Sequence, residues 1–120
     1  MKAGSFSGPV RCEWPEGEPR IVVITSALRY TDSRGRVWEA KPGAVADGAS
    51  IPRLCWLFVG SPFVGLYRRA SVIHDVYCDT QSRPWKAVHR VFHEMMLADG
   101  VPMVKAYAMG RAVWFGGPRW

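Results

Sequence analysis

Residues 66–79, with the sequence LYRRASVIHDVYCD, decide how the second half of this chain folds. The apolar residues of this stretch recur at spacings of three and four, the pattern of one helix face: Leu66, Ala70, Ile73 and Tyr77. At about 100° per residue, His74 lies about 80° from Leu66, at the edge of that face, and Asp75 lies nearer the opposite side. The stretch therefore predicts an amphipathic helix that carries a histidine beside the core.

A second helix is predicted next along the chain. It begins after Ser82, an N-cap residue type, with Pro84 just inside, and it ends near Asp99. His89 and His93 lie one turn apart on the border of its apolar face. Three charged residues are expected further toward solvent: Lys86, Arg90 and Glu94. A third helix is predicted from about residue 103 to residue 114.

The first third of the chain favours β-structure. Residues 20–25 are mostly β-branched and predict a strand. Residues 28–31 and 37–40 flank the turn-forming stretch 32–36, which contains Gly35, and predict a hairpin. Strands first and helices after predict an α+β fold, a small N-terminal antiparallel sheet followed by three helices.

The domain organisation is simple. Residues 1–19 are rich in Gly and Pro and predict an irregular N-terminal arm or a short edge strand, and residues 20–120 predict a single α+β domain. The loop over 47–52 leads into a short helix expected over 53–59, which Ser50 could cap.

The composition is that of one soluble globular domain. With 48% hydrophobic and 22% charged residues in 120, disorder and coiled coil are excluded. The net charge of +6 suits an acidic partner. Apolar runs fall far short of the roughly 20 residues that cross a bilayer, so we expect no membrane span. Three cysteines and no apolar leader predict no disulfide framework, no signal peptide and a reducing compartment.

One polar constellation carries candidate chemistry. His89 and His93 are separated by four residues on one helix, and His74 and Cys78 repeat that spacing one helix earlier. Such pairs can reach one metal ion, and three imidazoles with one thiolate would complete a tetrahedral site for a divalent metal such as zinc. His74, His89 and a carboxylate could instead leave a position open for water. A third interpretation makes these residues ordinary core and surface side chains.

The same region permits acid–base chemistry without a metal. His74 could accept a proton near neutral pH while a carboxylate orients its other ring nitrogen. Asp75 is poorly placed for that task because adjacent helical residues diverge by about 100°, whereas Asp47 lies in a glycine-containing loop that could reach the helix. Ser50 is a candidate nucleophile, with helix capping as the structural alternative.

Five basic residues could form a surface beside the two helices and bind phosphate or another anion: Arg68, Arg69, Arg83, Lys86 and Arg90. Tyr67 and Trp85 would offer stacking faces to a nucleic acid. The alternative is a solvated rim, because no run reaches five like charges.

Several of these motifs together resemble a known family. They are DGASIP at 47–52, Ala70-x-x-Ile73-His74-Asp75, Phe92-x-x-Met95-Met96 and the closing GGPRW at 116–120. This pattern resembles domain-of-unknown-function family 1353, small proteins of bacteriophages and prophages. The resemblance covers roughly residues 20–120 and implies a phage origin and a cluster of Asp47, Ser50, His74 and Asp75. Where members usually carry an Ala-Asp pair this chain has Val88-His89, and where they tend to carry Tyr it has Cys78.

Two main functions are compatible with these observations, beside a third, nucleic-acid binding through the arginine-rich rim. The leading one is a hydrolase-like activity, metal-assisted through His74, His89, His93 and Cys78, on a cell-envelope or phosphate-bearing substrate. The other is a non-enzymatic virion, tail-assembly or host-interaction protein, in which the same residues form a structural hydrogen-bond network. A phage structural or host protein, an anionic substrate and nucleic acid are the partners to consider. The expected location is the host cytoplasm or the virion.

Overall fold

The computed structural model of the protein describes residues 3–17, 21–48, 51 and 65–120. The predicted helix over 53–59 and its cap Ser50 lie outside these residues. Six short strands come first: β1 Ser5–Phe6, β2 Cys12–Glu13, β3 Val22–Ile24, β4 Leu28–Thr31, β5 Val37–Ala40 and β6 Val45–Ala46. A 3₁₀ turn and three helices follow: η1 Gly65–Tyr67, α2 Arg68–Thr80, α3 Trp85–Ala98 and α4 Met103–Gly116. The predicted α+β fold is confirmed.

The strands form two antiparallel three-stranded sheets, with the orders β1-β4-β5 and β2-β3-β6. The predicted hairpin is the β4–β5 pair, in which Tyr30 lies opposite Trp38. The N-terminal stretch, expected as an irregular arm or a short edge strand, supplies an edge strand to each sheet through β1 and β2. The sheets are small and depend on the helices for burial of their apolar side chains.

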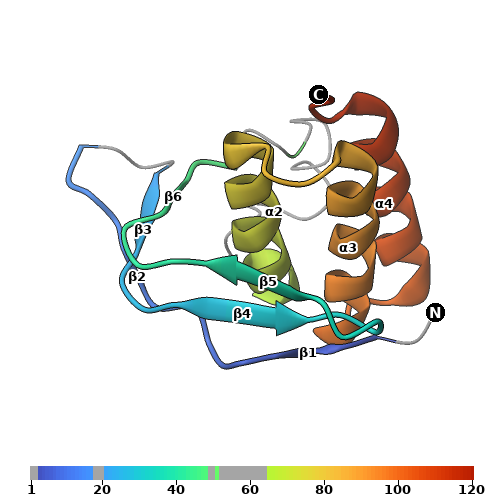
Figure 1. Cartoon of the computed structure of the whole chain (residues 1–120), viewed down its shortest axis with the longest axis horizontal. Coiled ribbons are helices and arrows are strands. Elements are labelled where there is room, and N and C mark those ends of the chain that lie inside the picture. Colours follow the sequence, from blue (N-terminus) through green and yellow to red (C-terminus); the bar gives the residue numbers. More distant parts are fainter. Residues whose placement is uncertain (1–2, 18–20, 49–50, 52–64) are drawn as a thin grey trace.

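The helices lie side by side, and the β4–β5 hairpin crosses them on one face (Figure 1). Helix α3 lies between α2 and α4 and packs against both. Helix α2 also contacts β5 and β6, so side chains around most of its circumference are covered. The largest core side chains come from both layers: Trp38, Tyr30, Phe92, Ile24 and Leu28.

Asp32 organises the turn between β4 and β5. One of its carboxylate oxygens accepts the backbone N–H groups of Arg34 and Arg36, and the other accepts Arg36 Nε at 3.1 Å and the Trp38 indole N–H at 3.0 Å. Gly35 has φ +83°, a conformation that glycine adopts without steric cost. Burial acts to raise the pKa of Asp32, but these hydrogen bonds hold it below its usual value.

Three expectations about helix details are wrong. Leu66 is 49% exposed because it lies in η1, ahead of α2, and does not belong to the buried face. The N-cap position of α3 is Pro84, which has an extended backbone, so Ser82 does not cap the helix. Glu94, expected to face solvent, is buried on α3.

Candidate functional site: a buried histidine and cysteine trio

Two histidines and a cysteine meet between α2 and α3. His74 Nε2 lies 2.8 Å from His89 Nδ1, and Cys78 Sγ lies 3.6 Å from His74 Nε2. One ligand atom from each of the three residues can be chosen so that all lie within 4.8 Å of one another. We call His74, Cys78 and His89 the trio. Within the described part of the chain, it is the one group of three or more His, Cys, Asp or Glu residues with metal-site spacing.

The trio is deeper than the helical pattern indicates. His74 is 0% exposed, His89 1% and Cys78 8%. His74 was expected at the edge of the apolar face, and that expectation is wrong because α3 and the sheet residues cover α2 beyond the stripe itself. The His74 ring also lies 4.6 Å from the ring of Phe92, centroid to centroid.

A chain of hydrogen bonds determines which ring nitrogens carry protons. His89 Nε2 lies 2.7 Å from the backbone oxygen of Pro118, and a carbonyl oxygen only accepts. His89 Nε2 therefore donates, and Nδ1 of the neutral ring carries a lone pair. His74 Nε2 then donates to that lone pair, and His74 Nδ1 is left as an acceptor, 3.8 Å from Cys78 Sγ.

Both histidines are held in the neutral form. Burial, reinforced by the neighbouring His89, lowers the pKa of His74 far below its ordinary value near 6.5. Burial also lowers the pKa of His89; the Pro118 hydrogen bond opposes this effect and Arg119 adds to it. Neutral imidazole is the form that binds transition metals.

The donor set and spacing fit zinc. Tetrahedral zinc, with bonds of about 2.0–2.1 Å to nitrogen and about 2.3 Å to sulfur, places its ligand atoms about 3.3–3.6 Å apart. The Cys78–His74 distance of 3.6 Å already has this value; the His74–His89 pair, at 2.8 Å, would have to open, and the widest pair, at up to 4.8 Å, would have to close. The Pro118 carbonyl on His89 Nε2 is the outer partner that commonly orients a metal-binding histidine.

Asp75 anchors the loop that precedes the site. Its Oδ2 accepts the backbone N–H of Asp47 at 2.8 Å, which ties the end of β6 to α2. The loop was predicted to contact this helix, and the hydrogen bond between the Asp47 backbone N–H and the Asp75 carboxylate is such a contact. Ser50 lies outside the described residues, so its predicted role as a nucleophile stays a prediction.

His93 lies on α3 but outside the trio. It lines a pocket of about 200 Å³ between α3 and α4, together with His89 and with residues of α4 that include Tyr107, Gly110 and Trp114. Helix α4 comes close here because Gly110 has no side chain: a Cβ at this position would lie 3.3 Å from His93 Cβ. The pocket therefore reaches the α4 side of His89, whose side chain is itself buried.

Residues 118–120 cover the other side of His89. The Pro118 carbonyl accepts His89 Nε2, and the Trp120 ring meets the His89 ring edge-on at 6.1 Å. The Trp120 indole N–H donates to the Arg83 backbone oxygen at 2.8 Å, and Arg119 stacks over Trp85. This segment keeps His89 in place and shields it from solvent.

Glu94 forms a second buried polar contact that the sequence pattern missed. It accepts a short hydrogen bond from the Tyr30 hydroxyl and another from the Ser33 hydroxyl at 2.8 Å. Burial, followed by the bond to Glu94, strongly raises the pKa of Tyr30 and keeps the phenol protonated. Nothing in the helical pattern around Glu94 indicates that its hydrogen-bond partner is Tyr30, a strand residue 64 positions away.

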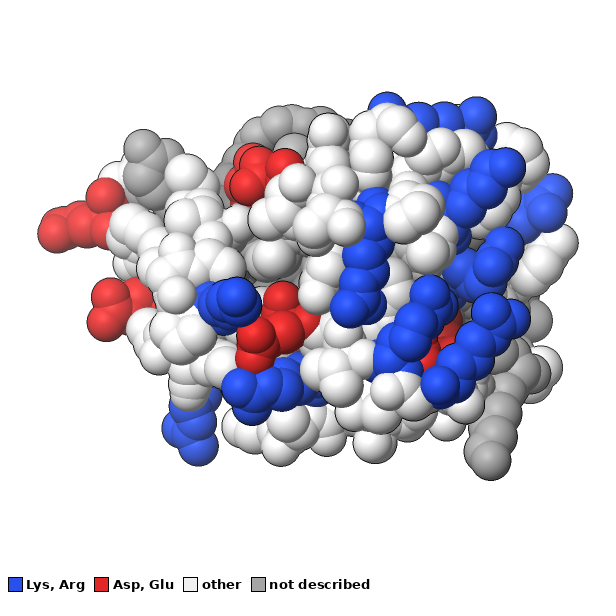
Figure 2. Space-filling view, in the orientation of Figure 1, with Lys and Arg blue, Asp and Glu red and all other residues white. Residues whose placement is uncertain are grey.

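At least three residues of the predicted basic surface are engaged in contacts within the protein. Arg69 pairs with Asp99 and donates to the Gly8 carbonyl, and Arg83 stacks over Trp38 and donates to Val37. Lys86 lies over the Trp85 ring. Lys and Arg side chains gather on the half of the visible face that lies over α3 and α4 (Figure 2). In the described residues, no helix is both long enough and apolar enough to span a membrane.

Together, these features define a small α+β domain with a histidine and cysteine trio buried between its first two long helices. Residues 22–113 match the family described as "Protein of unknown function (DUF1353)", and the chain belongs to that family. This agrees with the family resemblance of its motifs.

Two relatives come from Sinorhizobium fredii (strain NBRC 101917 / NGR234). "Uncharacterized protein y4iH" is 50% identical over 104 residues, which cover 87% of this chain and 44% of that protein. "Uncharacterized protein y4jT" is 42% identical over 118 residues, 98% of this chain and 35% of that protein. This chain thus spans less than half the length of either relative. No solved structure matches it.

Proposed function

We propose that the protein is a small zinc-dependent hydrolase in which His74, Cys78 and His89 bind the metal. The observation that carries this proposal is the trio itself, two neutral imidazoles and one thiol at metal-site spacing. Three protein ligands are the number that catalytic zinc sites use, whereas structural sites usually have four. Zinc bound in this way would supply a water whose pKa is lowered to about 7.

The pocket between α3 and α4 supports a catalytic role over a purely structural one. His89 belongs both to the trio and to the wall of this pocket. Tyr107 and Trp114 supply apolar surface there, and Arg90 and Arg111 supply positive charge. A substrate with an acidic group, such as a phosphate-bearing or cell-envelope compound, suits this lining. A phage or prophage origin, with action in the host cytoplasm or the virion, completes the proposal and rests on the motif resemblance.

Metal analysis of protein purified without a histidine tag tests the metal. We expect about one zinc per chain, lost in Cys78→Ser and His89→Ala. His93→Ala, which changes a histidine on the same helix, and Cys12→Ser, which changes a half-buried cysteine of β2, are the matched controls and should keep the metal. A zinc-free wild-type protein after growth with added zinc, or equal loss in the controls, would contradict the proposal.

Hydrolysis assays test the activity. Zinc-loaded protein should cleave a member of a panel of phosphate esters and cell-wall fragments, and chelation should abolish that cleavage. Tyr107→Ala changes the pocket wall and should lower the rate while zinc stays bound. Val104→Ala, also exposed on α4 but outside the pocket, is the control and should leave the rate unchanged.

Burial of the trio favours one alternative, a non-enzymatic virion, tail-assembly or host-interaction protein. In that case, the chain from Pro118 through His89 to His74 is a structural network that joins residues 118–120 to α2 and α3. Removal of one member would then cost several kcal/mol, because it strands a buried partner. Such a loss in His74→Ala, in a wild-type protein that binds no metal, would establish this alternative.

A further inference from the structure

We propose that a second site, between the β4–β5 turn and α3, binds a phosphate group through Arg34, Arg36 and Arg90. A pocket of about 150 Å³ lies here, lined by the turn residues on one side and by Ala87, Arg90, Val91 and Glu94 of α3 on the other. The trio takes no part in this pocket, but Arg90 also lines the α3–α4 pocket, so Arg34 and Arg36 of the turn distinguish this site from the proposed substrate pocket.

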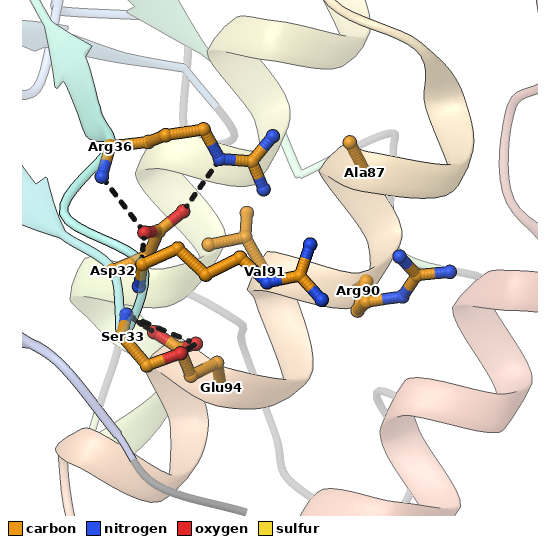
Figure 3. Close-up of a pocket in the computed structure, with 8 residues that line it drawn as sticks. Asp32, Ser33, Arg36, Ala87, Arg90, Val91 and Glu94 are labelled. Atoms are coloured by element: carbon orange, nitrogen blue, oxygen red, sulfur yellow. Dashed lines mark hydrogen bonds and ion pairs between the residues drawn. The ribbon is translucent and has the colours of Figure 1, made fainter.

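The three arginines reach the pocket from two elements. Arg34 and Arg36 come from the turn, and Arg90 comes from α3. Arg36 lies on the turn side of the pocket and Arg90 on its α3 side, with Val91 between them (Figure 3). Guanidinium groups that converge from separate elements can contact different oxygens of one anion.

The acidic residues of the pocket are already engaged. Asp32 accepts two backbone N–H groups, the Trp38 indole and Arg36 Nε. Glu94 accepts Tyr30 and Ser33. Within the described residues, no hydrogen bond or ion pair engages the guanidinium of Arg34 or Arg90. Three guanidiniums against two carboxylates leave the pocket with a net formal charge of +1 (3 − 2), and the Arg34 and Arg90 guanidiniums are the two cations available to a ligand.

The pocket is also held in a fixed shape. Asp32 closes the turn, and the Arg36 guanidinium lies 5.5 Å from the centre of the Trp38 ring. Glu94 binds the Ser33 hydroxyl and so ties the turn directly to α3. Arginines on a braced frame lose less conformational freedom on binding than arginines on a mobile loop.

The number of acceptor oxygens favours phosphate over carboxylate. A phosphate monoester offers three acceptor oxygens and a charge of about −1.5 to −2 near pH 7, so it can accept from the Arg34 and Arg90 guanidiniums together, whereas a carboxylate offers two oxygens and a charge of −1. Val91 and Ala87 add a short apolar wall for the group that carries the phosphate. The carrier is a small phosphate ester or the backbone of a nucleic acid, two sources of the same chemistry.

The test follows backbone amide signals by NMR while inorganic phosphate is added, and then a short single-stranded DNA. Phosphate should shift the amides of residues 32–36 together with those of 87–94, and Arg34→Gln/Arg90→Gln should weaken binding at least tenfold. Arg34→Gln alone, which leaves the α3–α4 pocket unchanged, should also weaken it. Arg11→Gln/Arg68→Gln is the matched control, since it removes the same charge at two exposed arginines outside this pocket. The control should change the affinity less than twofold.

The outcomes separate the carriers and can reject the site. DNA that binds more tightly than phosphate, at the same amides and with steep salt dependence, identifies nucleic acid as the carrier. DNA that binds no more tightly identifies a small phosphate ester. Absence of shifts at residues 32–36 and 87–94, or equal weakening in the control variant, would overturn the inference.

Discussion

At the scale of single residues, one backbone oxygen organises the trio. The Pro118 carbonyl makes His89 Nε2 the donor, and this leaves His89 Nδ1 facing His74 Nε2. Because both rings are neutral, His89 Nδ1 offers its lone pair directly, and His74 would need only to move its proton from Nε2 to Nδ1 to offer one beside it. The same burial makes the metal-free protein sensitive to acid.

Stability of the chelated, metal-free protein should therefore fall as the pH falls. The lowered pKa values keep His74 and His89 neutral in the folded state, while the unfolded chain takes up protons below about pH 6.5. Their contribution is complete above that pH and decreases below it, by at most about 1.4 kcal/mol per pH unit for each histidine. Urea unfolding between pH 7.5 and 5 measures this slope.

His74→Gln supplies the comparison for that slope. It removes one of the two buried titrating groups, so its free energy of unfolding should depend less steeply on pH, by about one proton. An identical slope in the wild type and the variant, or a stability that rises toward pH 5, would show that the histidines do not titrate as a buried neutral pair.

At the scale of elements, Glu94 joins the hairpin to α3. The Tyr30 hydroxyl, on a fully buried ring of β4, donates to Glu94, and so does Ser33 of the turn. Helix α3 thus reaches the sheet through one carboxylate on one side, while His89 and His93 border the pocket toward α4. One helix supplies residues to both proposed sites.

Glu94→Ala should destabilise the protein by about 1–3 kcal/mol, because it leaves the buried Tyr30 hydroxyl without its acceptor. Glu39→Ala is the matched control. Glu39 pairs with Arg29 at 2.6 Å near the surface, and its loss should cost at most about 1 kcal/mol. Thermal or urea unfolding of both variants measures the difference, and equal losses would mean that the Tyr30–Glu94 contact adds nothing beyond a surface pair.

Periodicity in the sequence predicted the elements but not their depth. The spacing in 66–79 and the turn residues 32–36 were enough to predict α2 and the β4–β5 hairpin. The burial of His74 and Glu94 depends on what packs over each helix, and residues 118–120 and β4 are far away along the chain. The i, i+4 spacing placed His89 and His93 on one helix face. It does not reveal that both line the α3–α4 pocket but that His89 alone also joins the trio with residues of α2.

At the scale of the whole molecule, the α+β arrangement explains why the chemistry concentrates on α3. The β1-β4-β5 sheet crosses one face of the helices, the β2-β3-β6 sheet lies beside α2, and α3 lies between α2 and α4 (Figure 1). The trio lies at the α2–α3 contact, the candidate substrate pocket lies at the α3–α4 contact, and the proposed phosphate site lies at the contact of α3 with the β4–β5 turn. Two of these three features meet at His89.

X-ray absorption at the zinc edge of the untagged protein tests the zinc centre most directly. A trio-bound metal should show one sulfur at about 2.3 Å and nitrogen or oxygen neighbours at about 2.0–2.1 Å. Cys78→Ser should remove the sulfur contribution, and His93→Ala should leave the spectrum unchanged. Zinc surrounded only by nitrogen and oxygen in the wild type, or a sulfur signal that survives Cys78→Ser, would contradict the assignment of the metal to these three residues.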